Sequence, residues 1–257
     1  MIEYHGISDN FDLEGKTAII TGGTRGIGYA TAALFIRKGV NVVLIGRSAE
    51  IVDAAAALGK NAHAARGDIT SKEFIRETMN DTLQRFGSAD ILVNNAGIVA
   101  LESAETMPED MWDTTLNVNL KGGFLMSQAF AAMLIENKRP GSIVFVASQA
   151  GVIALDKHAA YSSSKGGMIA LTRDLAYEWA KYGIRVNCVS PTWVTTDSFK
   201  KGVDWQGPEG KELLKLLPAG RFAEPDEIAA SIIFLAGDNA AMITGQNLII
   251  DGGYTIL

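Results

Sequence analysis

The sequence predicts an α/β fold, a single doubly wound domain built on a parallel seven-stranded sheet. Short runs of apolar, often β-branched residues alternate along the chain with longer patterns of helical periodicity. The short runs are apolar throughout, which indicates strands covered on both faces by helices. The chain has 257 residues, 47% of them hydrophobic, enough for one large core, and no linker, low-complexity tract or repeat divides residues 1–257.

The first half of the chain is expected to hold four strands separated by three helices. Strands, of which the third is the least apolar, are predicted at residues 17–21, 41–45, 61–65 and 90–93. Helices are predicted between them at residues 27–38, 49–58 and 71–86. The third helix has Ser71 at its start, because a serine hydroxyl accepts a hydrogen bond from a free backbone N–H of the first turn.

The second half continues this alternation and adds one irregular segment. Helices are predicted at residues 109–136, with an interruption, at residues 161–182, and from Pro225, which suits a first helical turn. Strands are predicted at residues 142–147, 184–189 and 247–250. Residues 192–218 are rich in Gly, Pro, Lys and Trp. A long irregular segment in a compact domain is usually functional, so we expect a substrate lid there.

Composition argues against several classes of protein. The net charge is −6 with acids and bases interspersed, so no basic patch indicates nucleic-acid binding, and no apolar run is expected to span a membrane. Residues 1–16 have neither the basic start nor the apolar stretch of a secretory signal. The single cysteine, Cys188, lies in an apolar run and is expected to be a buried structural thiol. One thiol allows no internal disulfide, which favours the reducing cytoplasm.

A glycine-rich segment, Thr21-Gly-Gly-Thr-Arg-Gly-Ile-Gly28, follows the first predicted strand and opens the first predicted helix. Free N–H groups at a helix N-terminus attract anions, and glycines lack the Cβ atoms that would keep a diphosphate away from the backbone. Glycines also serve ordinary tight turns, so the segment alone is weak evidence. Its position between the first strand and the first helix favours dinucleotide binding.

The spacing Gly-x3-Gly-x-Gly, together with Asn94-Asn-Ala-Gly97 after the fourth strand, resembles the short-chain dehydrogenase/reductase family. The resemblance covers residues 15–254 and implies a Rossmann fold that binds a nicotinamide cofactor. It also implies that Asp68 contacts the adenine and that Asn94 begins a motif shaping the floor of the cofactor site. The cofactor-binding residues that it implies are Gly22, Thr24, Arg25, Gly26, Ile27, Gly28, Arg47, Ser48, Asp68, Ile69, Asn95, Ala96, Gly97, Tyr161, Lys165, Pro191, Val194 and Thr196.

The end of the second strand bears on the choice between NAD(H) and NADP(H). Gly46 stands where NAD-preferring family members usually carry an acid that binds the ribose hydroxyls. Arg47 follows it, and a guanidinium suits a 2′-phosphate through charge-assisted bonds that Arg25 could also make. We therefore expect NADP(H) to be favoured, with NAD(H) possible. In the alternative, Arg47 stacks on adenine or faces water, which leaves dual or NAD specificity.

Four further residues indicate catalysis. Tyr161 and Lys165, four positions apart, share one face of a helix, a pairing that alone more often reflects packing and a solvated lysine. Ser148 at the end of the fifth strand and Asn119 upstream of it complete the order Asn…Ser…Tyr-x3-Lys, which resembles the catalytic set of the family. The resemblance implies that Tyr161 is the general acid/base and that Ser148 binds the substrate oxygen. It implies that Asn119 holds a water linking Lys165 to solvent.

The chemistry explains why a lysine accompanies the tyrosine. Reduction of a carbonyl needs a hydride and a proton, and oxidation of an alcohol needs a base. Free tyrosine titrates near pH ~10, too high for an effective base at neutral pH. Lys165, together with the positive nicotinamide ring, is expected to lower the pKa of Tyr161, and the resemblance also assigns Lys165 to the nicotinamide ribose.

The substrate is indicated by the segment 147–161 and by the ending Asp251-Gly-Gly-Tyr-Thr-Ile256, which are similar to those of bacterial polyol dehydrogenases of the family. Gln149, His158 and Trp193 are the predicted substrate residues, since buried hydroxyl groups need hydrogen-bond partners. His158 could equally be a surface or helix-capping residue. Aromatic residues of the lid would also suit an apolar ketone, so a ketone or 3-oxoacyl-thioester reductase stays as the alternative. A non-enzymatic nicotinamide sensor is a remote one.

Other expectations concern partners and residues without chemistry. The resemblance implies a small-molecule substrate and a homotetramer. No metal is expected, because His5, His63 and His158 show no ligand spacing. Residues 221–225 and 251–254 resemble structural landmarks of the family, and no chemical role is expected for them.

Overall fold

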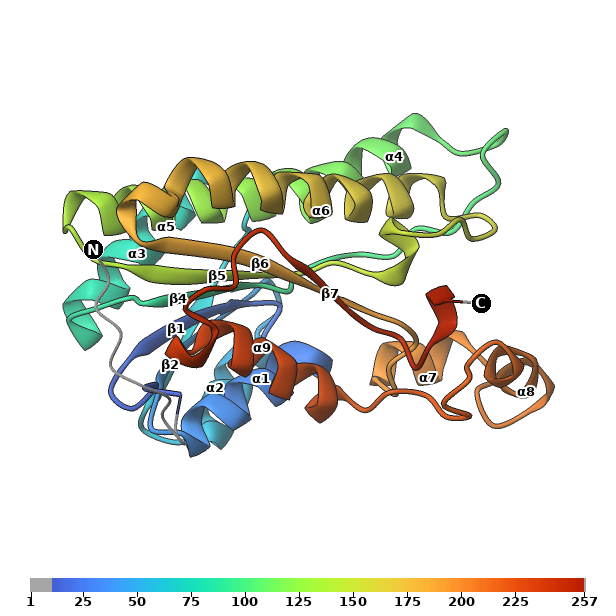
Figure 1. Cartoon of the computed structure of the whole chain (residues 1–257), viewed down its shortest axis with the longest axis horizontal. Coiled ribbons are helices and arrows are strands. Elements are labelled where there is room, and N and C mark those ends of the chain that lie inside the picture. The colour runs from blue at the N-terminus through green and yellow to red at the C-terminus, as the bar shows by residue number, and fades with distance from the viewer. Residues whose placement is uncertain (1–10, 257) are drawn as a thin grey trace.

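A computed structural model describes residues 11–256, so the N-terminal residues 1–10, including His5, lie outside it. Its centre is one sheet of seven parallel strands in the order β3-β2-β1-β4-β5-β6-β7 (Figure 1). The strands are β1 Thr17–Thr21, β2 Asn41–Gly46, β3 Ala62–Arg66, β4 Ile91–Asn94, β5 Gly141–Val146, β6 Ile184–Pro191 and β7 Asn247–Ile250. The predicted doubly wound α/β fold is confirmed, and each predicted strand is present within two residues of its expected bounds.

Helices cover both faces of the sheet and form two apolar cores with it (Figure 1). One face carries α1 Gly26–Arg37, α2 Glu50–Leu58 and α9 Pro225–Ala236. The other carries α3 Lys72–Phe86, α4 Glu109–Leu116, α5 Gly123–Glu136 and α6 Ala159–Trp179. Phe35 and Leu44 are fully buried in the first core, and Phe130 and Phe145 in the second. Covered on both faces, β1 is buried at all five positions, which explains its uninterrupted apolar sequence.

The long helix of the second half is interrupted, as expected, at a position that the sequence did not predict. A π-helical turn, Asn117–Gly122, separates α4 from α5. The stretch Glu109–Glu136 reaches the length and the mean hydropathy, 1.2, of a membrane span, contrary to the expectation that no apolar run would. Half of its most apolar window is buried inside the protein, as in the core helix of a soluble domain, so it is weak evidence for a membrane.

The expected irregular lid contains two short helices, which the sequence analysis missed. They are α7 Asp197–Gly202 and α8 Pro208–Lys215. Thr196 caps α7 by accepting a hydrogen bond from the backbone N–H of Phe199 at 3.3 Å, and Pro208 occupies the first turn of α8. Helices of two turns or fewer show too little periodicity to stand out in a sequence rich in Gly, Lys and Trp.

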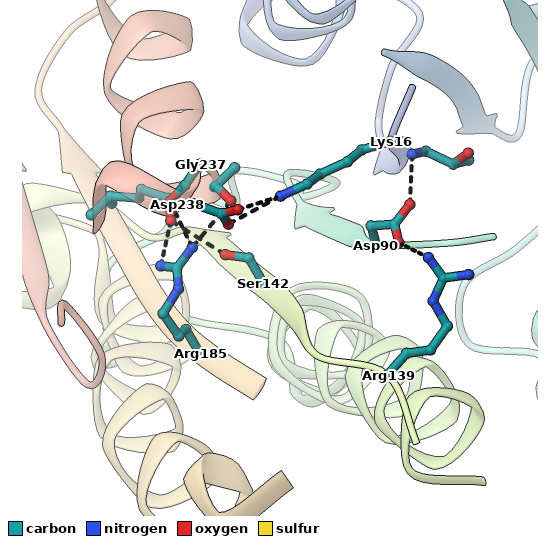
Figure 2. A network of polar contacts seen from close by, with 10 residues as sticks. Lys16, Asp90, Arg139, Ser142, Arg185, Gly237 and Asp238 are labelled. Carbon is teal, nitrogen blue, oxygen red and sulfur yellow. Dashed lines mark hydrogen bonds and ion pairs between the residues drawn. The ribbon is translucent and has the colours of Figure 1, made fainter. Parts of the chain in front are cut away.

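A polar network fastens the amino-terminal edge of the sheet (Figure 2). Asp90 accepts hydrogen bonds from the backbone N–H of Thr17 at 2.9 Å and from Arg139 at 2.9 Å. Arg185 donates to the last carbonyls of α9, among them Leu235 at 2.7 Å and Gly237 at 2.9 Å. Burial lowers the pKa of Arg185 to about 10, so the side chain stays charged at neutral pH. This network leaves the carboxyl-terminal edge free for function.

Candidate active site

A cleft of about 1100 Å³ runs along the carboxyl-terminal edge of the sheet. Strand order reverses between β1 and β4, and ligands of doubly wound sheets bind in the crevice at such a point. All but two of the predicted site residues line this cleft; Gly28 and Asn119 do not. Several residues that sequence reasoning left out of the site also line it, among them Val99, Leu101, Leu155, Thr192, Leu213, Leu216 and Tyr254.

The glycine turn forms a backbone cradle at one part of the cleft. Gly22 and Gly26 have φ values of 67° and 58°, which L side chains rarely adopt. A Cβ on Gly28 would lie 2.4 Å from the Gly22 carbonyl oxygen and 2.5 Å from Asn95 Nδ2. The same Nδ2 donates to the carbonyls of Thr21 and Gly22, both at 3.0 Å. The cradle therefore has the bare backbone and the helix N-terminus that a dinucleotide diphosphate needs.

Asn119 braces the site from the π-helical turn. Its side chain accepts from the Ile98 N–H at 2.8 Å, donates to the Ile98 carbonyl at 2.9 Å, and donates to Ser164 Oγ at 3.0 Å. It thus ties the loop after β4 to α6. A Cβ on Gly97 would lie 3.2 Å from Asn119 Oδ1 and 3.5 Å from Lys165 Nζ, so Gly97 packs close to both side chains.

Ser148, Tyr161 and Lys165 meet at the middle of the cleft. Ser148 lies two residues after the end of β5, and its hydroxyl accepts a hydrogen bond from the Ala150 N–H at 3.1 Å. Tyr161 and Lys165 lie on successive turns of α6, with Lys165 Nζ 5.6 Å from the centre of the Tyr161 ring. Lys165 is buried and donates to the Val146 carbonyl at 2.7 Å, so its ammonium is fixed beside the end of β5.

Burial sets the protonation states of Tyr161 and Lys165 in the free protein. It raises the pKa of Tyr161, against a smaller lowering by the hydrogen bond with Ser148. The expected lowering by Lys165 is therefore not a property of the protein alone, and Tyr161 is a phenol at neutral pH. Burial lowers the pKa of Lys165 to about 8, so this lysine remains an ammonium at neutral pH.

The shifted pKa of Lys165 predicts a pH dependence of stability. Between about pH 8 and pH 10 the unfolded lysine holds a proton that the folded one has lost, so the free energy of unfolding rises with pH. Across this window we expect the wild type to gain up to about 3 kcal/mol relative to Lys165→Met. Chemical denaturation of both proteins at each pH measures it, and parallel pH profiles would contradict the assignment.

The substrate side of the cleft contains buried polar atoms without partners. Gln149 Oε1 and Thr192 Oγ1 are buried and have no hydrogen bond within residues 11–256. His158 occupies the position before α6 but makes no capping bond; its ring lies 6.0 Å from that of Tyr161, edge to face. Gln149 and Thr192 both line the cleft, although these two oxygens are themselves covered, so a change of side-chain rotamer would bring them to a ligand hydroxyl.

Cys188 is fully buried and its Sγ donates to Asn247 Oδ1 at 3.2 Å. Burial raises the pKa of this thiol to about 11, which fits the expected structural role. Within residues 11–256, no group of three or more His, Cys, Asp or Glu is placed to hold a metal ion.

A doubly wound sheet with a diphosphate cradle at its switch point and a Tyr–Lys pair beside it defines the class of dinucleotide-dependent oxidoreductases. A family model described as enoyl-(acyl carrier protein) reductase matches residues 22–255. The chain is 46% identical to an NAD-dependent glycerol dehydrogenase of Listeria innocua, over 98% of this chain and 99% of that one. It is 45% identical to a D-threitol dehydrogenase of Mycolicibacterium smegmatis, over 96% and 95%.

Solved structures agree with these matches. A short-chain type dehydrogenase/reductase from Mycobacterium marinum superposes with a TM-score of 0.91 at 32% identity, covering 97% of this chain and 99% of that one. The chain belongs to the short-chain dehydrogenase/reductase family. It is an NAD(P)-dependent enzyme that acts on CH–OH groups.

Proposed function

We propose that this enzyme interconverts a polyol or sugar alcohol and the corresponding ketose or hydroxyketone, with NADP(H) as the favoured cofactor. The observation that carries the proposal is the meeting of Ser148, Tyr161 and Lys165 in the cleft that holds the diphosphate cradle. The polar residues Gln149, Thr192 and His158, which line the cleft, support a substrate with several hydroxyl groups. The names of the two enzymes reported above, which act on glycerol and D-threitol, support the same substrate class.

The proposed roles follow from where the side chains lie. A bound nicotinamide supplies or accepts the hydride. In the reducing direction Tyr161, a phenol at neutral pH, donates its proton to the carbonyl oxygen while the Ser148 hydroxyl holds that oxygen. In the oxidising direction Tyr161 takes the hydroxyl proton back. The Lys165 ammonium, held by the Val146 carbonyl, stabilises the phenolate that forms.

Asn119 acts in this proposal as a positioning residue. Its bonds to Ile98 and Ser164 set the loop after β4 against α6, and Gly97 packs close to both its oxygen and Lys165. The expected water between Asn119 and Lys165 remains part of the proposal. Gln149, His158 and Trp193 would contact the substrate, and residues 192–218, with α7 and α8, would close over it.

The preference for NADP(H) is supported by the end of β2. A Cβ on Gly46 would lie 2.8 Å from Thr24 Oγ1 and 3.1 Å from Ile51 Cδ1, so an acidic side chain would be crowded there. Arg25 and Arg47 line this end of the cleft, as does Glu50, whose carboxylate lies 3.5 Å from Ser48 Oγ. Asp68 adds a second carboxylate at this end, and the two guanidinium groups are the groups there that can bind a phosphate.

Arg47→Gln tests this preference. We expect it to lower kcat/KM for NADP(H) by about tenfold or more, because a hydrogen bond to a charged group is lost, and to leave kcat/KM for NAD(H) nearly unchanged. Arg85→Gln, in the last turn of α3 and outside the cleft, is the matched control. A wild-type preference for NAD(H) of about tenfold or more would refute the proposal.

One observation favours a second candidate function. The family model that matches the chain is described as an acyl-carrier-protein reductase, and Leu213 and Leu216 of the lid face the cleft. A 3-oxoacyl-thioester or general ketone substrate would use these apolar side chains. Comparing oxidation of glycerol and longer sugar alcohols with reduction of an acetoacetyl thioester, by nicotinamide absorbance, separates the two functions.

We further propose that residues 1–257 form one catalytic domain and that the enzyme is a cytoplasmic homotetramer. Apolar side chains exposed on α6 and β7, including Tyr177 at 89% and Leu248 at 38%, support contacts between subunits. The lone buried thiol is compatible with a reducing compartment. Sedimentation analysis of the purified protein tests the oligomeric state, and a monomer at micromolar concentration would contradict it.

A further inference from the structure

The order of the strands gives the cleft a direction. Arg47 and Asp68, at the ends of β2 and β3, lie at one end of the cleft, and the glycine turn and Ala96 follow at β1 and β4. Ser148 comes next, after β5. Beyond it come the ends of β6 and β7, which pair as far as Pro191 and Ile250. The part of the cleft beyond β5 therefore lies past the reacting group on the side away from the adenine end.

Three consecutive strands each deliver a polar side chain to that part of the cleft. Gln149 follows β5, Thr192 follows β6 and Tyr254 follows β7, and all three line the cleft. The Thr192 N–H donates to the Ile250 carbonyl at 3.1 Å, so the ends of β6 and β7 are held together. Neighbouring strands lie ~4.8 Å apart, which gives a row of roughly 10 Å from the end of β5 to the end of β7.

Tyr254 is held at the far end of this row by a tight turn. The Asp251 carboxylate accepts from the N–H groups of Gly253 at 2.9 Å and Thr255 at 2.7 Å. Gly253 has a φ of 92°, and the Gly252 carbonyl accepts from the Ala219 N–H at 2.9 Å, which joins the turn to the end of the lid. The turn fixes the backbone on both sides of Tyr254, as a binding residue requires.

The ring of Tyr254 forms an aromatic wall with Trp193. The ring centres are 5.2 Å apart and tilted by 36°, and both residues are partly exposed to the cleft. Neither the Tyr254 hydroxyl nor the Trp193 indole N–H makes a hydrogen bond within residues 11–256. Such a wall offers apolar ring faces to the C–H groups of a carbon chain and polar atoms to its hydroxyls.

We propose that Tyr254 is a specificity-determining residue that selects polyols by chain length, an inference that rests on the polyol substrate proposed above. A three-carbon alcohol held at Ser148 stays near Gln149 and Thr192. A longer chain extends further along the row, towards Tyr254. The residue would then stabilise the longer substrates and contribute little to glycerol.

The test compares glycerol, a four-carbon and a five-carbon sugar alcohol in the wild type, Tyr254→Phe and Tyr254→Ala. We expect Tyr254→Ala to lower kcat/KM for the longer alcohols by about tenfold or more while glycerol changes by less than about threefold. Tyr254→Phe keeps the ring and should lose part of this selectivity. If the alanine variant does not fold, the phenylalanine variant still tests the proposal. Tyr182→Phe, in the 3-10 turn Ala180–Tyr182 that follows α6 and outside the cleft, is the control.

Cofactor affinity, measured by nucleotide fluorescence without alcohol, should be the same in all four proteins. Equal losses for all three alcohols, or no loss, would overturn the role of Tyr254 and leave the proposed function standing. A wild type that oxidises none of the three alcohols would overturn both proposals.

Discussion

Tyr161→Phe should lower turnover by at least about a hundredfold, because the proton of the reacting oxygen loses its donor and acceptor. The ring remains, so its edge-to-face contact with His158 should persist. The melting temperature and the affinity for the nicotinamide cofactor should therefore stay near the wild-type values. Steady-state kinetics in both directions, with a thermal melt and a nucleotide titration, measure the three quantities.

Tyr177→Phe provides a matched control for that variant. It removes a phenolic hydroxyl from the same helix outside the cleft, and it keeps the ring that the proposed subunit contact would use. Full activity of Tyr177→Phe together with a large loss in Tyr161→Phe would show that the lost activity comes from the missing Tyr161 hydroxyl. Turnover of Tyr161→Phe within about tenfold of the wild type would instead remove Tyr161 from the role of general acid/base.

The strands of this fold were predictable because burial on both faces requires a short run of consecutive apolar residues in the sequence. β1 and β2 carry unbroken apolar runs, and the predicted bounds differ from the observed ones by at most one residue at either end. The start of α3 was also predictable from nearby residues, since the Ser71 hydroxyl accepts a hydrogen bond from the Phe74 N–H at 3.3 Å. The order of the strands leaves no such mark, because it depends on pairing between distant segments, and no order was predicted.

The candidate site divides in the same way. Ser148, Tyr161 and Lys165 form a motif with fixed spacing, so the sequence alone brings attention to them. Tyr254 was set aside as a structural landmark, because only the pairing of β7 with β6 brings it to the cleft. The bonds of Asn119 to Ile98 and Ser164 depend on the π-helical turn, whose extra residue per turn has no clear sequence signal.

Gly28→Ala should damage the cofactor cradle even though Gly28 does not line the cleft. The new methyl group would lie 2.4 Å from the Gly22 carbonyl oxygen, a backbone atom that moves only if α1 or the turn moves. We expect the melting temperature of the free protein to fall by roughly 3–10 °C, from about 1–3 kcal/mol of overpacking. The nucleotide Kd should rise by about tenfold or more, because the diphosphate contacts lie on the displaced turn.

The control is Gly202→Ala at the end of α7, where an added Cβ meets no atom within 4 Å. Its melting temperature should match that of the wild type, which separates crowding from the general effect of replacing a glycine. If Gly28→Ala melts and binds nucleotide like the wild type, the close packing of α1 on the turn is not what shapes the cradle. Together the two glycine variants test whether the diphosphate site depends on backbone contact behind it as well as on the residues that face it.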